Sequence, residues 1–210
     1  MVVFETWEEV IASGKTYDLL YADPPWRYER DTKGLTGCAS NRPDGNGYIT
    51  MPDEDIKNMG VDRIANKNSF LCMWATGARM DSAIDIMRAW GFSYTTMLFV
   101  WVKQSRDKST RMVMGNYTRP STEFVLLGKR GRGIKIPVED KIRNMHQVVR
   151  HEIIGHSVKP PEFVGLIQKL FHNPPQKIEL FARVGFEGWD LFGNEAEYSS
   201  VPLTLQSKLR

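Results

Sequence analysis

The apolar residues of this chain fall in short blocks that predict a series of strands. Five blocks are rich in aromatic, β-branched and other large apolar residues, at residues 17–22, 70–74, 92–102, 123–127 and 177–182. The first block, Tyr17 to Ala22, is followed directly by Asp23-Pro24-Pro25, and two consecutive prolines end a strand.

Amphipathic segments between these strands predict helices. Thr6-Trp7-Glu8-Glu9 has the form of a capping box, and the short helix that it opens should stop at Gly14. The clearest helix spans residues 79–90, where apolar residues recur at helical spacing before a glycine. Further helices should open at Pro52 and at Pro160-Pro161.

Strands that alternate with helices predict an α/β fold, with a sheet covered by helices on both faces. We find no internal repeat or linker, so we expect one domain over residues 1–210, with a core at about 17–195 and a loose tail at 203–210. In such sheets ligands bind beyond the carboxyl ends of the strands. Asp23 and Arg183 both follow predicted strands, so both should lie at that edge.

Composition narrows the class of protein. The 210 residues are 41% hydrophobic and 25% charged, which is typical of a soluble globular domain. No apolar run approaches the roughly 18 residues of a membrane span, and the N-terminus has no signal-peptide pattern. The two cysteines, Cys38 and Cys72, indicate neither a disulfide framework nor a metal cluster. We therefore expect an intracellular protein, located in the cytoplasm.

Positive charge is concentrated in one segment. Residues 103–150 hold 12 Lys and Arg against four Asp and Glu, although the whole chain carries a net charge of only +3. Basic side chains in this segment, which include Arg119, Lys129, Arg130 and Arg132, are candidates for contact with a nucleic-acid backbone. The alternative is a solvated loop and hairpin.

The motif with the most definite chemistry is Asp23-Pro24-Pro25-Trp26. As a structural element it is a rigid turn with an incidental aromatic residue. As a catalytic element it suits an amino group on an aromatic ring, whose lone pair is delocalised and poorly nucleophilic. A carboxylate and a proline-stiffened carbonyl can accept its two hydrogens and turn the lone pair toward an electrophilic methyl group. A following tryptophan can stack on the base.

Further motifs occur in a definite order after Asp23-Pro24-Pro25-Trp26. The chain contains Tyr48-Ile-Thr-Met51, Phe70-Leu-Cys-Met-Trp-Ala-Thr-Gly77, Trp101-Val-Lys103, His156-Ser-Val-Lys-Pro160, Lys177-Ile-Glu-Leu-Phe-Ala-Arg183 and Gly193-Asn194. In sequence and order this set resembles the catalytic subunits of messenger-RNA adenosine methyltransferases, together with their bacterial and phage relatives that modify adenine in DNA. The resemblance covers about residues 17–195.

The resemblance implies a Rossmann-like methyltransferase that uses S-adenosylmethionine, with a mostly parallel sheet and the catalytic motif ahead of the cofactor elements. It implies that Asp23 and the Pro24 carbonyl hold the target amine and that Pro25 stiffens the turn. Trp26 and Tyr48 would shape the base pocket. The cofactor-binding residues that it implies, besides Asp23, are Lys159, Arg183, Asn194 and Glu195.

Two departures from the family pattern stand out. Glu195 occupies a position where the family often has glutamine, although a carboxylate also accepts hydrogen bonds from ribose hydroxyls. The chain also has no Gly-x-Gly-x-x-Gly motif, which the family's permuted order tolerates.

Three histidines, His146, His151 and His156, recur every five residues. This spacing suits no single face of a helix or strand, so we interpret them as structural and expect no metal site.

The leading hypothesis is an adenine N6-methyltransferase acting on DNA, of bacterial or phage origin, in a bacterial or phage-infected cell. RNA adenine, cytosine N4 and a protein glutamine amide are alternative substrates, since each has an NH2 group on sp2 carbon. A non-catalytic nucleic-acid-binding protein on the same fold is the alternative of another class. Homodimers or heterodimers remain open, and no membrane partner is expected.

Overall fold

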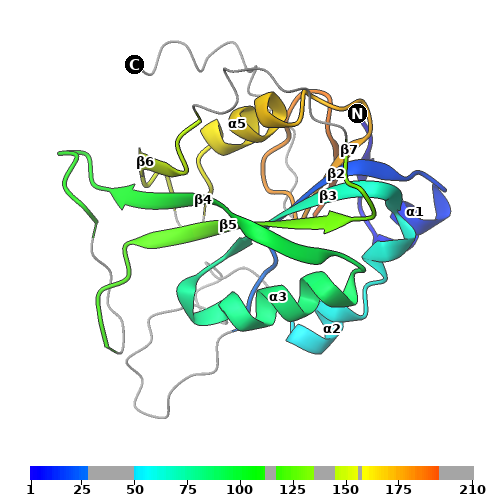
Figure 1. Cartoon of the computed structure of the whole chain (residues 1–210), viewed down its shortest axis with the longest axis horizontal. Coiled ribbons are helices and arrows are strands. Elements are labelled where there is room, and N and C mark those ends of the chain that lie inside the picture. Colours follow the sequence, from blue (N-terminus) through cyan, green and yellow to red (C-terminus); the bar gives the residue numbers. More distant parts are fainter. Residues whose placement is uncertain (28–49, 112–116, 135–144, 156–157, 194–210) are drawn as a thin grey trace.

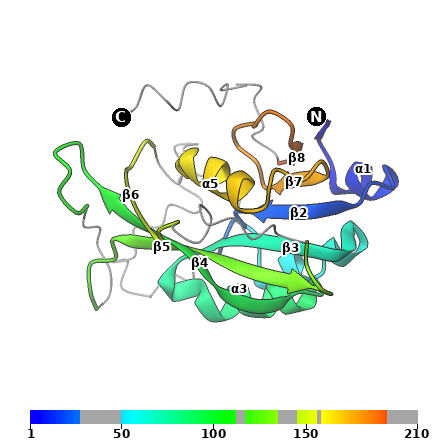
Figure 2. The same ribbon diagram turned by 45° about the horizontal axis from the view of Figure 1, so that its top comes forward.

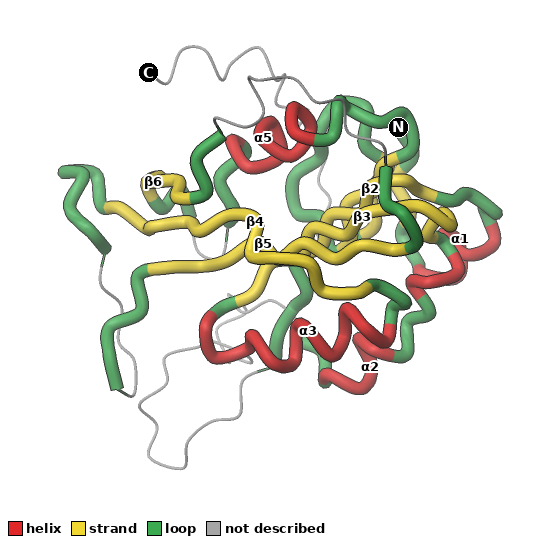
Figure 3. The backbone as a smooth tube through the Cα atoms, in the orientation of Figure 1, coloured by secondary structure: helices red, strands yellow, loops and turns green. Residues whose placement is uncertain are grey.

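The computed structural model describes residues 1–27, 50–111, 117–134, 145–155 and 158–193. Eight strands in this part of the chain form one sheet, drawn in yellow in Figure 3. In sheet order they are β1 (Val3–Phe4), β8 (Asp190–Phe192), β7 (Lys177–Leu180), β2 (Tyr17–Ala22), β3 (Ala65–Ala75), β5 (Thr122–Arg130), β4 (Ser93–Gln104) and β6 (Val148–Glu152). Adjacent strands are parallel except at β5, which is antiparallel to both β3 and β4.

Helices cover both faces of this sheet (Figures 1 and 2). Helix α5 (Glu162–Leu170) lies on one face, and α2 (Asp53–Lys57) and α3 (Met80–Ala89) lie on the other, as labelled in Figure 1. Helix α1 (Trp7–Ala12) packs Val10 into the same core as α2 and α3. The fold is therefore the expected α/β architecture with a mostly parallel sheet.

The side chains of the central strands alternate between two apolar cores. In β2, Leu20 and Ala22 pack with α2 and α3, whereas Leu19 and Tyr21 pack with α5. Burial on both faces is the reason for the nearly continuous apolar run of this strand. The alternation also directs Tyr21 toward the α5 side, which holds the candidate site described below.

Most predicted elements are confirmed, with shifts at their ends. Strand β2 has the predicted bounds, and Thr6 forms the capping box of α1 with Glu9. Pro52 is the N-cap of α2 rather than its first residue. Strand β3 begins at Ala65, ahead of the predicted start, because Ala65 pairs with Tyr17 at the beginning of β2. Strand β5 likewise continues through Arg130.

Three short strands were not predicted from the sequence. Strands β1, β6 and β8 contain two, five and three residues, and their patterns are too short to separate from loops. His151 lies in β6, where its ring nitrogen Nδ1 lies 2.8 Å from the carbonyl oxygen of Glu152. His156 and the tail at 203–210 lie outside the described residues.

In the residues that the structure describes, no helix is long and apolar enough to cross a membrane.

Candidate active site

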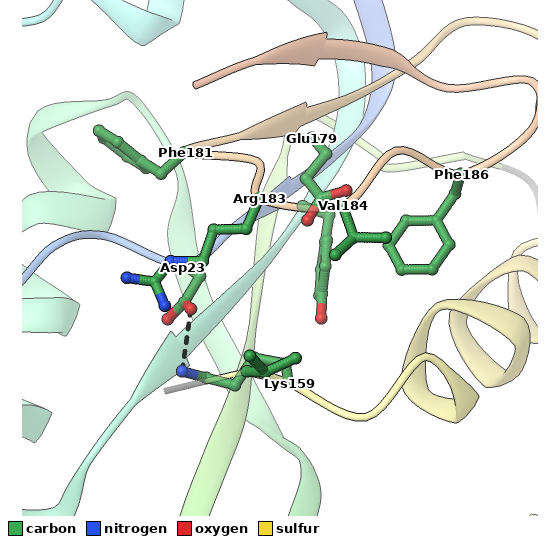
Figure 4. A pocket seen from close by; sticks show the side chains of 9 residues that line it. Asp23, Lys159, Glu179, Phe181, Arg183, Val184 and Phe186 are labelled. Atoms are coloured by element: carbon green, nitrogen blue, oxygen red, sulfur yellow. Dashed lines mark ion pairs between the residues drawn. The ribbon is translucent and has the colours of Figure 1, made fainter. Parts of the chain in front are cut away.

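A hollow lies at the carboxyl ends of the neighbouring parallel strands β2 and β7 (Figure 4). Asp23, Lys159 and Arg183 reach it from three separate segments: the end of β2, the approach to α5 and the turn after β7. The other lining residues are Tyr21, Val158, Glu179, Phe181, Val184 and Phe186.

Backbone hydrogen bonds fix the Asp23-Pro24-Pro25-Trp26 turn at both ends. The Asp23 amide donates to the Leu180 carbonyl of β7 over 3.4 Å. The Met51 amide donates to the Pro25 carbonyl over 2.9 Å, and Met51 also forms a β-bridge with Trp26. The Pro24 carbonyl accepts the Trp26 amide over 2.9 Å, and a carbonyl oxygen has a second lone pair that can accept another hydrogen bond.

Trp26 lies behind this turn rather than beside an open base pocket. Its side chain belongs to the core under α2 and α3, and only 5% of its surface is exposed. The Arg79 guanidinium lies 5.6 Å from the centre of its ring and forms an ion pair with Asp53. Trp26 therefore supports the turn from the core, and its stacking on a base stays a prediction.

Four charged side chains of alternating sign run across this edge of the sheet. Lys159 Nζ lies 2.9 Å from Asp23 Oδ2 and 3.2 Å from Glu123 Oε2. The second oxygen of Glu123, Oε1, accepts from Lys103 Nζ over 2.6 Å. All four side chains are mostly buried, with side-chain exposures between 11% and 21%. We call Asp23, Lys159, Glu123 and Lys103 the charge row.

Burial and mutual attraction set the protonation of the charge row. Burial raises the pKa of Asp23 above its usual value, although the Lys159 ammonium opposes this. Burial disfavours the charged form of Lys159, but Asp23 and Glu123 outweigh it and raise the pKa of Lys159. Burial would likewise raise the pKa of Glu123, but Lys159 and Lys103 together lower it. These shifts favour the carboxylate form of Glu123 and the ammonium form of Lys159.

Two further polar groups lie deeper in the hollow. The Trp74 indole donates to the Tyr21 hydroxyl over 2.5 Å, and burial raises the pKa of Tyr21. Glu179 in β7 is 7% exposed, and its Oε2 atom has no hydrogen-bond partner in the described part of the chain. Burial also raises the pKa of Glu179, and the negative charge of Asp23 adds to this effect.

The structure separates the basic residues that the sequence grouped together. Because β5 is antiparallel to β3, Lys129 and Arg130 pair with Phe70 and Ser69, near the start of β3. They lie about 20 Å along β5 from Phe124, which pairs with Ala75 at the carboxyl end of β3, on the side of the sheet that holds Asp23. There Arg130 Nη1 donates to the Asp62 carbonyl over 2.6 Å.

The other predicted site residues have different outcomes. Arg119 is exposed and precedes β5, four residues before Glu123, so it lies on the catalytic side of the sheet. Arg132, in the turn after β5, is at the opposite edge with Lys129 and Arg130. The predictions for Tyr48, Asn194 and Glu195 lie outside the described residues.

Sequence reasoning missed Glu123, Lys103, Glu179 and Arg79 as parts of this site. A signal did exist for the two glutamates, since each is an acidic residue within an otherwise apolar strand. A carboxyl group is expensive to bury unless it is paired or has a function.

Known proteins are similar to this chain over most of its length. The model of the MT-A70 family matches residues 17–195. The type II methyltransferase M.MunI of a Mycoplasma species is 32% identical over 206 residues, which cover 93% of this chain and 84% of that protein. The human N(6)-adenosine-methyltransferase catalytic subunit METTL3 is 23% identical over 189 residues, which cover 86% of this chain but 28% of that protein. The mouse N(6)-adenine-specific methyltransferase METTL4 is 22% identical over 200 residues, or 39% of its length.

Proposed function

The chain belongs to the MT-A70 family, and from this premise we propose that it transfers a methyl group from S-adenosylmethionine to the N6 amine of adenine in DNA. The observation that carries the proposal is the Asp23 carboxylate, which lines the hollow, is held by Lys159 at 2.9 Å and is followed by a proline-stiffened carbonyl. We favour DNA because the chain matches the type II methyltransferase M.MunI over 84% of that protein's length. It matches the animal relatives METTL4 and METTL3 over only 39% and 28% of theirs.

The residues of the hollow fit S-adenosylmethionine. Its amino-acid part carries a carboxylate and an ammonium group, and the hollow presents both cations (Lys159, Arg183) and carboxyl groups (Asp23, Glu179). Lys159 and Arg183 would hold the carboxylate, while Asn194 and Glu195 would accept hydrogen bonds from the ribose hydroxyls. When bound, the cofactor supplies an electrophilic methyl carbon on a sulfonium sulfur.

Asp23 and Pro24 would prepare the amine of the base. The Asp23 carboxylate accepts one N–H, and the remaining lone pair of the Pro24 carbonyl accepts the other. With both hydrogens held, the nitrogen lone pair is withdrawn from the ring and directed toward the methyl group. The nitrogen is cationic after transfer, and its extra proton can leave by way of the Asp23 carboxylate to water. Because a paired base is inaccessible, the enzyme must flip it or act on single strands.

The substrate can be identified directly. Purified protein with methyl-labelled S-adenosylmethionine should label DNA, and nucleoside analysis of the product should show N6-methyladenine. RNA, cytosine N4 and glutamine remain the alternative acceptors, and preferential labelling of RNA or protein would replace DNA as the substrate. We propose that the enzyme acts in the cytoplasm of a bacterial or phage-infected cell. A homodimer or heterodimer is compatible with this function.

Arg119 should contribute to DNA binding more than the basic turn at the opposite edge. Arg119 lies on the catalytic side, whereas Lys129 and Arg132 lie far from Asp23. Arg119→Gln should weaken DNA binding and reduce the slope of log affinity against log salt by about 0.9, as for one lost phosphate contact. Lys129→Gln/Arg132→Gln serves as the comparison. A larger loss of DNA affinity in that double variant would instead place the DNA backbone beside the basic turn near the start of β3.

Arg79 should support catalysis from behind the Asp23-Pro24-Pro25-Trp26 turn. It stacks on Trp26 and pairs with Asp53, so Arg79→Gln should loosen the turn and lower kcat by up to about a hundredfold. Arg88→Gln is the matched control, because Arg88 forms an exposed ion pair with Asp85 within α3, and Arg79 caps the start of that helix. Equal kcat values for the two variants would show that the turn does not need Arg79.

A further inference from the structure

Glu179 occupies a position in β7 where its neighbours carry aromatic or aliphatic side chains. In the ladder it lies between Tyr21 of β2 and Leu191 of β8, both of which belong to the core beneath α5. Ile178 and Leu180, before and after it, face the opposite core. An apolar residue would satisfy this position at less cost, so a purely structural role does not account for the carboxyl group.

The carboxyl group of Glu179 has an oxygen without a protein partner. Oε2 accepts no hydrogen bond from the described residues, and the side chain lines the hollow with only 7% of the residue exposed. Buried polar atoms of native proteins are nearly always paired, and an exception of this kind calls for an explanation such as a ligand. Figure 4 shows Glu179 among the side chains that surround the hollow.

The neighbours of Glu179 indicate what this ligand carries. Asp23 and Tyr21 from β2, Lys159 from the approach to α5 and Arg183 after β7 are the titratable and charged groups that line the hollow with it. Asp23 is already held by Lys159 at 2.9 Å, and its role toward the target amine occupies it further. Of the two carboxyl groups that line the hollow, Glu179 is therefore the one that can accept a hydrogen bond from a positively charged donor through its unpaired Oε2 atom.

We propose that Glu179 accepts a hydrogen bond from the α-ammonium group of S-adenosylmethionine and gives up its own proton to water when the cofactor binds. This inference rests on the proposed function. An amino-acid head carries its ammonium and carboxylate on one carbon, which matches a hollow that presents Glu179 close to the cations Lys159 and Arg183. No covalent bond of the cofactor forms or breaks in this step. One proton leaves the carboxyl group, and an ammonium N–H replaces it.

The surroundings of Glu179 favour the protonated form of its carboxyl group in the enzyme without cofactor. Burial, and then the charge of Asp23, raise the pKa of this carboxyl group well above its usual value. A raised pKa means that the folded state binds a proton that the unfolded state has released. Cofactor binding should therefore release a proton near neutral pH, and its affinity should increase as pH rises.

Calorimetry in two buffers of different ionisation enthalpy tests this linkage. At pH 7, binding of S-adenosylmethionine to the wild-type protein should release up to about one proton. Glu179→Gln should abolish the release and weaken binding about 10- to 100-fold, since one charge-assisted hydrogen bond is lost. Asp85→Asn, the same kind of change at an exposed carboxylate of α3 outside the hollow, is the matched control and should retain the release. The probe 5′-methylthioadenosine, which lacks the amino-acid head, should bind without proton release and with equal affinity to the wild type and Glu179→Gln.

Thermal stability without cofactor provides a second readout. The raised pKa means that the wild-type protein loses stability, relative to Glu179→Gln, as pH rises from about 4 through the folded-state pKa of Glu179. The variant should therefore melt higher at pH 7, with little difference near pH 4. A lower melting temperature of the variant at pH 7 would show that the carboxylate has a structural partner and would overturn the inference.

Failure of this inference can be separated from failure of the proposed function. If the wild-type protein binds S-adenosylmethionine and Glu179→Gln releases the same number of protons with the same affinity, the role of Glu179 is wrong and the methyltransferase proposal stands. If the wild-type protein methylates DNA but releases no proton on binding, the same conclusion holds. Absence of any cofactor binding would overturn both.

Discussion

Asp23→Asn should reduce kcat for methyl transfer by about a thousandfold while leaving the fold intact. The carboxylate must accept an N–H of the target amine, whereas an asparagine amide can present its own N–H groups to that nitrogen. The fold should tolerate the change because Lys159 keeps its ion pair with Glu123 at 3.2 Å. Methyl transfer to DNA and thermal melting measure the two effects. Near-normal turnover would remove Asp23 from the catalytic role.

The pH profile gives a second view of the same residue. Because burial raises the pKa of Asp23, its carboxylate is lost at a higher pH than that of an exposed aspartate. The acid limb of kcat/KM should therefore lie above the usual aspartate value of about 3.9. The ionised carboxyl group also adds no net stability at neutral pH, since a raised pKa favours the protonated form in the folded state. Asp23→Asn should consequently melt no lower than the wild type at pH 7.

Glu123→Gln should produce the largest loss of stability among these variants. Glu123 bridges Lys103 and Lys159, and without its charge the two buried ammonium groups lose their shared partner. Removing one member of such a group costs about 3 kcal/mol, which corresponds to a fall in melting temperature of about 6–12 °C. Denaturant unfolding and thermal melting at pH 7 measure the loss.

The charge row offers its own controls for this prediction. Glu123→Gln/Lys103→Met removes one charge of each sign, so it should recover much of the stability lost in the single variant. Lys57→Gln, which breaks the exposed pair with Glu54 on α2, should leave stability unchanged. A double variant as unstable as the sum of its single changes would show that the lysines do not depend on the shared carboxylate.

The same substitution should change the pH profile in a defined direction. The negative charge of Glu123 is one of the causes that raise the pKa of Asp23. Glu123→Gln should therefore move the acid limb of kcat/KM to lower pH, even though the variant is less stable. A loss of activity with no movement of the limb would indicate that Glu123 acts only through the fold.

The sequence was most informative where local pattern and chemistry coincide. The apolar run from Tyr17 to Ala22, ended by two prolines, predicted both a central strand and the place of Asp23 at its carboxyl end. The resemblance carried by the ordered motifs predicted that Lys159 and Arg183 bind the cofactor. Parallel pairing of β2 with β7 brings Arg183 to the same hollow as Asp23, and Lys159 reaches it from the approach to α5. The fold class was predicted for the same reason, since strands and helices alternate along most of the chain.

Contacts between distant segments could not be predicted in this way. The pairing of Trp101 with Glu123 in antiparallel β4 and β5 brings Glu123 toward Lys103, and no motif records that register. The reversed direction of β5 also places Lys129 far from the site, although it lies close to Glu123 in sequence. From the sequence alone, Trp26 is an aromatic residue next to a catalytic motif and is expected to stack on the base. Its burial in the core, with Arg79 over its ring, depends on contacts between distant segments that the sequence does not show.

The most direct test of the account is a crystal structure of the protein with S-adenosylhomocysteine, the product form of the cofactor. We expect its amino-acid head in the hollow between β2 and β7, within hydrogen-bond distance of Lys159, Arg183 and Glu179, and its sulfur directed toward the space before Asp23. Binding elsewhere, with Asp23 remote from the sulfur, would contradict the account.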